Sequence, residues 1–69
     1  MSTDIHHKEN GSRGVFFMRG DKGVSSELTY SLTDNVMVID HTETKREFEG
    51  RGLASQLLDK AVDYARNKD

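Results

Sequence analysis

One long helical stripe at the C-terminal end of the chain limits the fold more than any other feature. Its apolar residues recur at the three- and four-residue spacing of one face of a helix. The members of the stripe are Leu53, Ala54, Leu57, Leu58, Ala61, Val62 and Ala65. Burying Leu53, Leu57, Leu58 and Val62 would contribute about 1.5–3 kcal/mol each. The sequence therefore predicts a single amphipathic helix packed on a sheet.

Three β-rich runs precede the helix, at residues 14–19, 24–33 and 36–39. Gly20 to Gly23 and Asp34 to Asn35 supply the turn residues between them. The second run alternates like a half-buried strand, whereas the third is apolar on both faces, which is typical of a central strand. The predicted fold class is α+β, with a mainly antiparallel three-stranded sheet in the order β-β-β-α.

Residues 1–12 are predicted to be a flexible N-terminal segment, and residues 13–69 to form one domain. The segment is too polar to offset its ordering entropy. His6 and His7 are adjacent and point different ways, and no third ligand lies nearby, so we interpret them as a solvated tail and predict no metal site. A chain of 69 residues has marginal stability, and we expect help from a ligand or from a partner such as a second copy.

Composition excludes several classes of protein. The chain has no Cys, which rules out disulfides, thiolate zinc sites and a Cys nucleophile, and fits the reducing cytoplasm. Ten Lys and Arg residues are interspersed with twelve Asp and Glu residues, for a net charge of -2, so we expect no nucleic-acid partner. Neither a secretory leader nor a long apolar run is present, so we expect no membrane partner.

A glycine turn opens the helix and is the strongest candidate site. Gly50 and Gly52 lack the side chains that would keep a ligand away from the backbone. The first turn of a helix has four free amide donors and a partial positive charge, so it can hold a phosphate. Such glycines also serve as plain loop hinges. The dinucleotide and Walker patterns do not fit, because Ser55 occupies the third glycine position and no Gly-Lys-Ser/Thr follows.

Together with the segment from Ile39 to Glu43, this turn resembles the compact GCN5-related N-acetyltransferases. The resemblance covers nearly the whole chain and implies that acetyl-CoA is the co-substrate. It also implies a pyrophosphate-binding role for the turn, whose residues are Glu49, Gly50, Arg51, Gly52, Leu53 and Ala54. The chain departs from the pattern at Glu47, where Gln or Arg is usual. It also ends at Asp69, before the further strand and the cysteine of compact relatives, so the fold is expected to be truncated.

His41 and Glu43 are the candidate catalytic residues. Transfer to an amine needs a group that accepts its proton. In a regular strand His41 shares a face with Ile39 and Glu43, so Glu43 can orient the imidazole, while Asp40 and Thr42 face the other way. Two plainer interpretations stand beside this one: His41 only caps the strand, and Glu43 is a solvent-facing carboxylate. Backbone amides near the strand end are implied by the resemblance to polarise the thioester.

The sequence leaves three functions open. The first is direct acetyl transfer from acetyl-CoA to a small-molecule or peptide amine. The second is a non-catalytic coenzyme A or phosphate-binding module, which the absent cysteine and the short C-terminus favour. The third is an inert structural domain. The aromatic residues Phe16, Phe17 and Tyr30 are expected in the core and not in a substrate platform.

Overall fold

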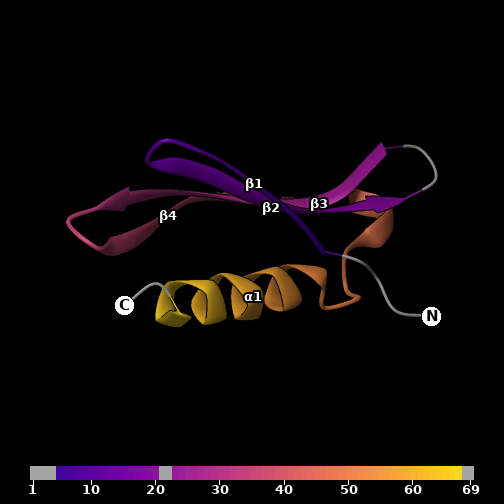
Figure 1. The fold of residues 1–69 in the computed structure, drawn as a ribbon. Coiled ribbons are helices and arrows are strands. Elements are labelled where there is room, and N and C mark those ends of the chain that lie inside the picture. The colour runs from indigo at the N-terminus through magenta and orange to yellow at the C-terminus, as the bar shows by residue number, and fades with distance from the viewer. Residues whose placement is uncertain (1–4, 21–22, 68–69) are drawn as a thin grey trace.

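The computed structural model describes residues 5–20 and 23–67, which form one antiparallel sheet with a helix on one of its faces (Figure 1). The elements are β1 (Ile5–Asn10), β2 (Arg13–Gly20), β3 (Gly23–Thr33), β4 (Val36–Thr44), a 3-10 turn η1 (Arg46–Phe48) and α1 (Leu53–Asn67). The strand order is β1-β2-β3-β4, so each strand pairs with its neighbours in sequence. The α+β class and the C-terminal helix are confirmed.

The sheet has four strands, so the prediction of three was wrong. The extra strand is β1, which falls in the segment predicted to be a flexible lead-in; residues 1–4 lie outside the described part of the chain. Polar contacts hold β1 in place. The His7 ring stacks on Phe16 at 4.1 Å between centroids, and its Nε2 is hydrogen-bonded to the Tyr30 hydroxyl at 2.5 Å. Hydrophobic periodicity does not detect a strand of this kind.

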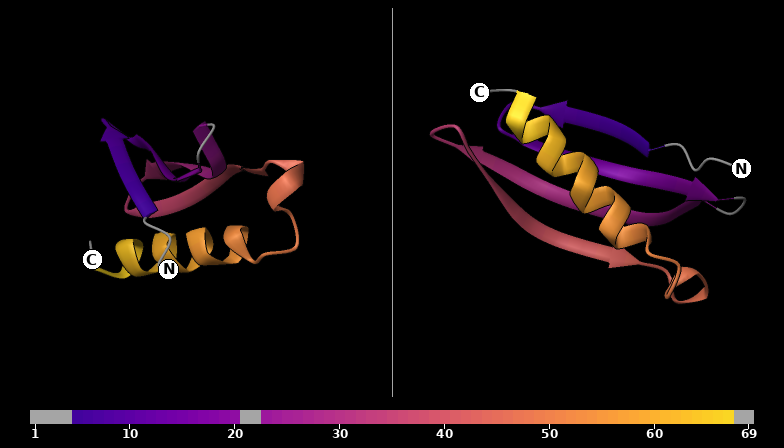
Figure 2. Two further views of the ribbon diagram at one scale, coloured as in Figure 1. Left: turned by 90° about the vertical axis from the view of Figure 1, so that its right-hand side faces the viewer. Right: turned by 90° about the horizontal axis from the view of Figure 1, so that it is seen from below.

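The core lies between the sheet and α1, on what we call the helix face (Figure 2). Its fully enclosed members are Phe16, Met18, Leu28, Tyr30, Leu57 and Ala61. Leu58 and Val62 were predicted to be buried, but they remain 45% and 42% exposed. The reason is the roll of the helix, whose half-buried Tyr64 reaches towards β1 and donates a hydrogen bond to Glu9 at 2.7 Å.

Tyr30 reaches β1 by crossing over β2 at Gly14. Gly14 pairs with Tyr30 on β3 and with Glu9 on β1, so the three residues share the helix face. A Cβ on Gly14 would fall on the hydroxyl and ring of Tyr30. The glycine therefore gives a large buried side chain room to span a neighbouring strand.

β4 is an edge strand and not the central strand that its apolar run predicted. Val36 and Val38 are 58% and 48% exposed. The pairing with β3 shifts so that Tyr30 opposes Ile39 and Thr29 opposes His41, which leaves Asp40 as an extra, bulged residue. Short apolar runs do not reveal which strand lies at an edge, because an edge strand that packs under a helix needs similar residues.

No helix within residues 5–20 and 23–67 combines the length and the apolar character needed to cross a membrane.

Candidate functional site

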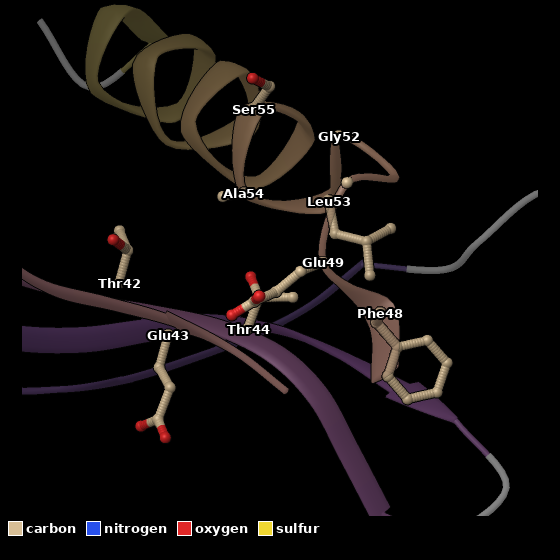
Figure 3. Close-up of a pocket in the computed structure, with 10 residues that line it drawn as sticks. Thr42, Glu43, Thr44, Phe48, Glu49, Gly52, Leu53, Ala54 and Ser55 are labelled. Carbon is tan, nitrogen blue, oxygen red and sulfur yellow. The ribbon is translucent and has the colours of Figure 1, made fainter. Parts of the chain in front are cut away.

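A pocket of about 400 Å³ lies on the helix face, where the end of β4 meets the beginning of α1 (Figure 3). It is lined by Thr42, Glu43, Thr44, Phe48, Glu49, Gly50, Gly52, Leu53, Ala54 and Ser55. Five of the six residues predicted to bind pyrophosphate therefore line one pocket. The sheet ends here and the chain must turn back to begin the helix, so backbone of the connection forms much of the wall.

Both glycines of the turn adopt the left-handed conformation, with φ of +82° at Gly50 and +71° at Gly52. Other residues are strained at such angles, so the backbone path itself requires glycine here. The space above each Cα is also open, because an added Cβ would meet nothing within 4 Å. A ligand can thus approach the backbone at both positions.

The helix begins directly after this turn. The Gln56 amide donates to the Gly52 carbonyl at 3.1 Å, which makes Gly52 the residue that caps the helix. By helical geometry the amides of Leu53, Ala54 and Ser55 have no acceptor inside the helix. These donors carry the partial positive charge of the helix start, and all three residues line the pocket.

Two charged residues of the turn behave differently from the glycines. The Glu49 amide donates to the Arg46 carbonyl at 3.2 Å, so it is occupied, and the Glu49 side chain lines the pocket with a negative charge. Arg51 does not line the pocket, because its guanidinium lies over the Phe48 ring at 5.3 Å. The charge that Arg51 can supply is therefore held beside the pocket.

His41 and Glu43 share a sheet face, as the alternation predicts, and His41 Nε2 lies 3.4 Å from Glu43 Oε1. Their side chains are 59% and 65% exposed. This face is opposite α1: His41 does not line the pocket, and Glu43 does line it, but in Figure 3 its carboxylate points away from Thr42 and the helix. The structure does not bring the two candidate catalytic side chains together with the glycine turn.

The predicted face of Ile39 and Asp40 was wrong, and the bulge explains why. Ile39 opposes the buried Tyr30 and so lies on the helix face, not with His41. Asp40 lies on the face opposite α1 instead. Its Oδ2 accepts a hydrogen bond at 2.7 Å from Ser31, which follows Tyr30 in β3 and therefore points to the opposite face. A single extra residue reverses the face of everything that precedes it in the strand.

Four pocket residues were missed from the sequence. Thr42 and Thr44 oppose Leu28 and Ser26 in the register, so they face the helix, and Phe48 and Ser55 complete the wall. The alternation of β4 already indicated that the two threonines share a face. Thr42 lies between His41 and Glu43, and Thr44 follows Glu43, so both point away from the face of His41 and Glu43. Choosing between the two faces required knowledge of the side on which α1 packs.

No cluster of metal-ligating side chains occurs in the described part of the chain. The pocket combines main-chain amides, two threonine hydroxyls and one apolar side, Phe48 and Leu53, so it suits a phosphorylated ligand held mainly by backbone. The fold and site thus define an α+β protein with a pocket between the end of its last strand and a glycine turn at a helix start.

Comparison with known proteins then specifies the family. The model of a family described as GCN5-related N-acetyl-transferase matches residues 15–69, which is most of the chain and includes β4, the glycine turn and α1. The chain belongs to this family. A search of curated proteins gave no match.

Proposed function

We propose that this chain is an acetyl-CoA-dependent N-acetyltransferase domain, which transfers an acetyl group directly to the amine of a small molecule or peptide. One observation carries the proposal: two left-handed glycines open a helix start onto a pocket beside the end of β4. Family membership supports the same conclusion, because a chain of this family is expected to use acetyl-CoA.

In this proposal the pyrophosphate of coenzyme A lies against the turn from Gly50 to Ala54. Hydrogen bonds from amides to a charged acceptor contribute about 1.5–3 kcal/mol each, so three or four of them support micromolar binding after the cost of association. Glu49 opposes this binding, since its carboxylate lines the same pocket. Thr42 adds a hydroxyl donor on the sheet side, whereas the Thr44 hydroxyl is bonded to Ser26 Oγ at 2.8 Å.

The chemical step belongs at the edge of β4. The acceptor nitrogen attacks the thioester carbonyl carbon, the carbon–sulfur bond breaks, coenzyme A leaves as a thiolate, and the nitrogen loses a proton. The bulge at Asp40 releases backbone groups from the ladder, and an amide there can polarise the carbonyl. His41 takes the proton, with Glu43 orienting its ring at 3.4 Å.

A second function is favoured by one observation. The side chains of His41 and Glu43 point to the sheet face opposite α1, although Glu43 itself lines the pocket, so a ligand held by the turn must pass around the β4 edge to meet these side chains. A module that binds coenzyme A or phosphate without catalysing transfer needs only the pocket. The two functions share the binding half of the site and differ in the use of His41.

Titration with acetyl-CoA, followed by heat-induced unfolding and calorimetry, tests the shared half. Saturation at about 100 times Kd should add roughly 2.7 kcal/mol of stability. Glu49→Gln should tighten binding several-fold, because it removes a negative charge from the pocket. Asp63→Asn, which neutralises an exposed carboxylate on α1 that does not line the pocket, is the matched control. An unchanged melting curve at millimolar acetyl-CoA would refute both functions.

Acetyl transfer to a panel of polyamines and lysine peptides separates the enzyme from the module. Transfer by the wild type, reduced at least tenfold in His41→Ala with a changed pH profile, supports the enzyme. Binding without any acetylated product supports the module. Transfer that His41→Ala leaves unaltered in rate and pH profile removes His41 from the mechanism.

A further inference from the structure

The sheet face opposite α1, which we call the open face, is covered by no element of the described chain (Figures 1 and 2). The register assigns side chains to this face. Its charged strand residues fall into two groups. The basic stripe consists of Lys8, Arg13 and Arg19 on β1 and β2, and the acidic stripe consists of Glu27, Asp40 and Glu43 on β3 and β4.

The basic stripe surrounds a buried ring. Lys8 Nζ and the Arg19 guanidinium lie 5.9 and 5.7 Å from the centroid of Phe17, which is only 7% exposed. Arg13 lies two positions from Val15 and four from Phe17 along β2, so it shares their face. All three cations are on exposed residues. One half of the open face is therefore positive.

The acidic stripe runs beside it. Glu27 opposes Phe17 on one side and Glu43 on the other, which places two carboxylates directly across a strand pair. Asp40 is fixed on the same face by its hydrogen bond from Ser31, the residue that opposes Arg13. Like charges across a strand pair are destabilising, so each stripe gains from an opposite charge nearby.

Within a single chain this compensation is only partial: Lys45 lines a small pocket together with Glu27 and Glu43, and His41 lies beside Glu43. Within residues 5–20 and 23–67 no ion pair joins the basic stripe to the acidic one, and Glu43 pairs only with His41. The basic stripe carries a formal charge of +3 and the acidic stripe a formal charge of -3, and the two run side by side along the strands. A surface with this arrangement is complementary to a copy of itself turned about an axis that runs along the strands.

We propose that the open face docks onto the open face of a second copy of this chain, about a two-fold axis parallel to the strands. This operation places β1 and β2 of one copy over β4 and β3 of the other. Position along the strands is preserved, so Arg13 of each copy lies near Asp40 of its partner, and Arg19 near Glu27. Two sheets pack face to face in this way in sandwiches.

The size of the face sets the strength of the dimer. Four strands at the usual spacing and rise make a face of roughly 500–600 Å² in each copy. The buried total of about 1,100 Å² is at the lower end of specific interfaces. The association is therefore concentration-dependent, and its charge pairs make it sensitive to salt. The pocket is on the other face, so acetyl-CoA binding does not depend on the dimer, whereas His41 and Glu43 lie on the open face, so the proposed transfer by His41 requires the undocked chain.

Sedimentation velocity with two charge-reversed chains tests the proposal. Arg13→Glu with Arg19→Glu makes the open face acidic, and Glu27→Lys with Asp40→Lys makes it basic. The wild type should dimerise, with affinity falling at least tenfold between about 0.05 and about 0.5 M NaCl. Each reversed chain alone should be monomeric, and an equimolar mixture of the two should form a heterodimer.

The control variant is Lys60→Glu with Arg66→Glu, on the exposed side of α1. It changes the net charge by the same amount as Arg13→Glu with Arg19→Glu and should leave the dimer intact. Circular dichroism checks folding; if the reversed chains do not fold, Arg13→Gln with Arg19→Gln should fold and still lose the dimer. A monomeric wild type at millimolar concentration, or a mixture that stays monomeric, overturns the proposal. A dimer that ignores every open-face change also overturns it, and would indicate the β4 edge with Leu58 and Val62.

Discussion

The two ends of α1 meet the sheet in different ways. At the C-terminal end, Tyr64 packs edge-on against His7 at 4.5 Å and against Phe16 at 5.7 Å, and its hydroxyl bonds to Glu9. At the N-terminal end, the helix starts from a glycine turn beside an open pocket. Aromatic rings pack together at the C-terminal end, which we call the filled end, whereas the N-terminal end, which we call the open end, leaves backbone exposed.

A directed chain of hydrogen bonds locks the filled end. The Tyr30 hydroxyl donates to Glu9 at 2.8 Å, so its oxygen must accept from His7, whose Nε2 therefore carries the proton. Glu9 also accepts from Tyr64, so three elements, β1, β3 and α1, meet at one carboxylate. One end of the helix is therefore fixed by packing and hydrogen bonds, and the other end leaves main-chain groups accessible.

The largest expected effect comes from Gly14→Ala. The new Cβ would occupy the position of the Tyr30 hydroxyl and ring, so Tyr30 must leave its site and the filled end must open. Unfolding in urea should show a loss of about 3 kcal/mol or more. Gly11→Ala, in the β1–β2 turn with open space around it, should lose only about 1 kcal/mol from its left-handed backbone. Equal losses in the two variants would contradict the crowding at Gly14.

The open end should respond in binding and not in stability. Gly52→Ala strains the turn at φ +71° and moves the first-turn amides, so acetyl-CoA should bind at least tenfold more weakly. Calorimetric titration measures this loss. Stability should fall by only about 1–2 kcal/mol, because no neighbour lies within 4 Å of the added Cβ. If Gly52→Ala binds as tightly as the wild type, the turn does not hold the ligand.

Tyr64→Phe tests whether the loss of one hydroxyl at the filled end affects binding at the open end. It removes the 2.7 Å hydrogen bond to Glu9 while keeping the ring contacts, so unfolding free energy should drop by about 1 kcal/mol. Acetyl-CoA affinity should not change, since Tyr64 does not line the pocket. A loss of affinity larger than twofold would show that the two ends are coupled.

The smallest effect is an alkaline loss of stability. Burial, reinforced by the hydrogen bond and charge of Glu9, raises the pKa of Tyr30 well above its ordinary value near 10. The unfolded chain releases this proton first, so stability is complete below about pH 10 and decreases as the pH rises further. Urea unfolding between pH 8 and about pH 10.5 should show a decline of under about 1 kcal/mol. Tyr30→Phe should remove that part of the decline.

The elements with strong internal patterns were predictable. The spacing from Leu53 to Ala65 located α1, and the alternation of Leu28 and Tyr30 located β3, because both signals depend only on which residues one element buries. The glycine turn was predictable as well, since Gly50 and Gly52 stand directly before the stripe. Its role as a ligand site and the roles of His41 and Glu43 stay predictions.

The remaining errors share one cause, which is contact between elements. β1 was missed because His7 and Glu9 are polar and gain their partners only when Tyr30 crosses Gly14. The exposure of Leu58 was missed because the roll of α1 is set by Tyr64 against β1. The face of Ile39 was missed because the bulge appears only in the pairing of β4 with β3.

The class of fold, the position of the helix and the glycine turn that opens it follow from the amino-acid sequence, because they depend only on local spacing and on the backbone freedom of glycine. The position of β4 at an edge, the pocket on the helix face and the direction of the His41 and Glu43 side chains towards the other face depend on the packing of the elements. Side-chain alternation states only that two faces exist. Which face receives the helix depends on how all the elements pack together.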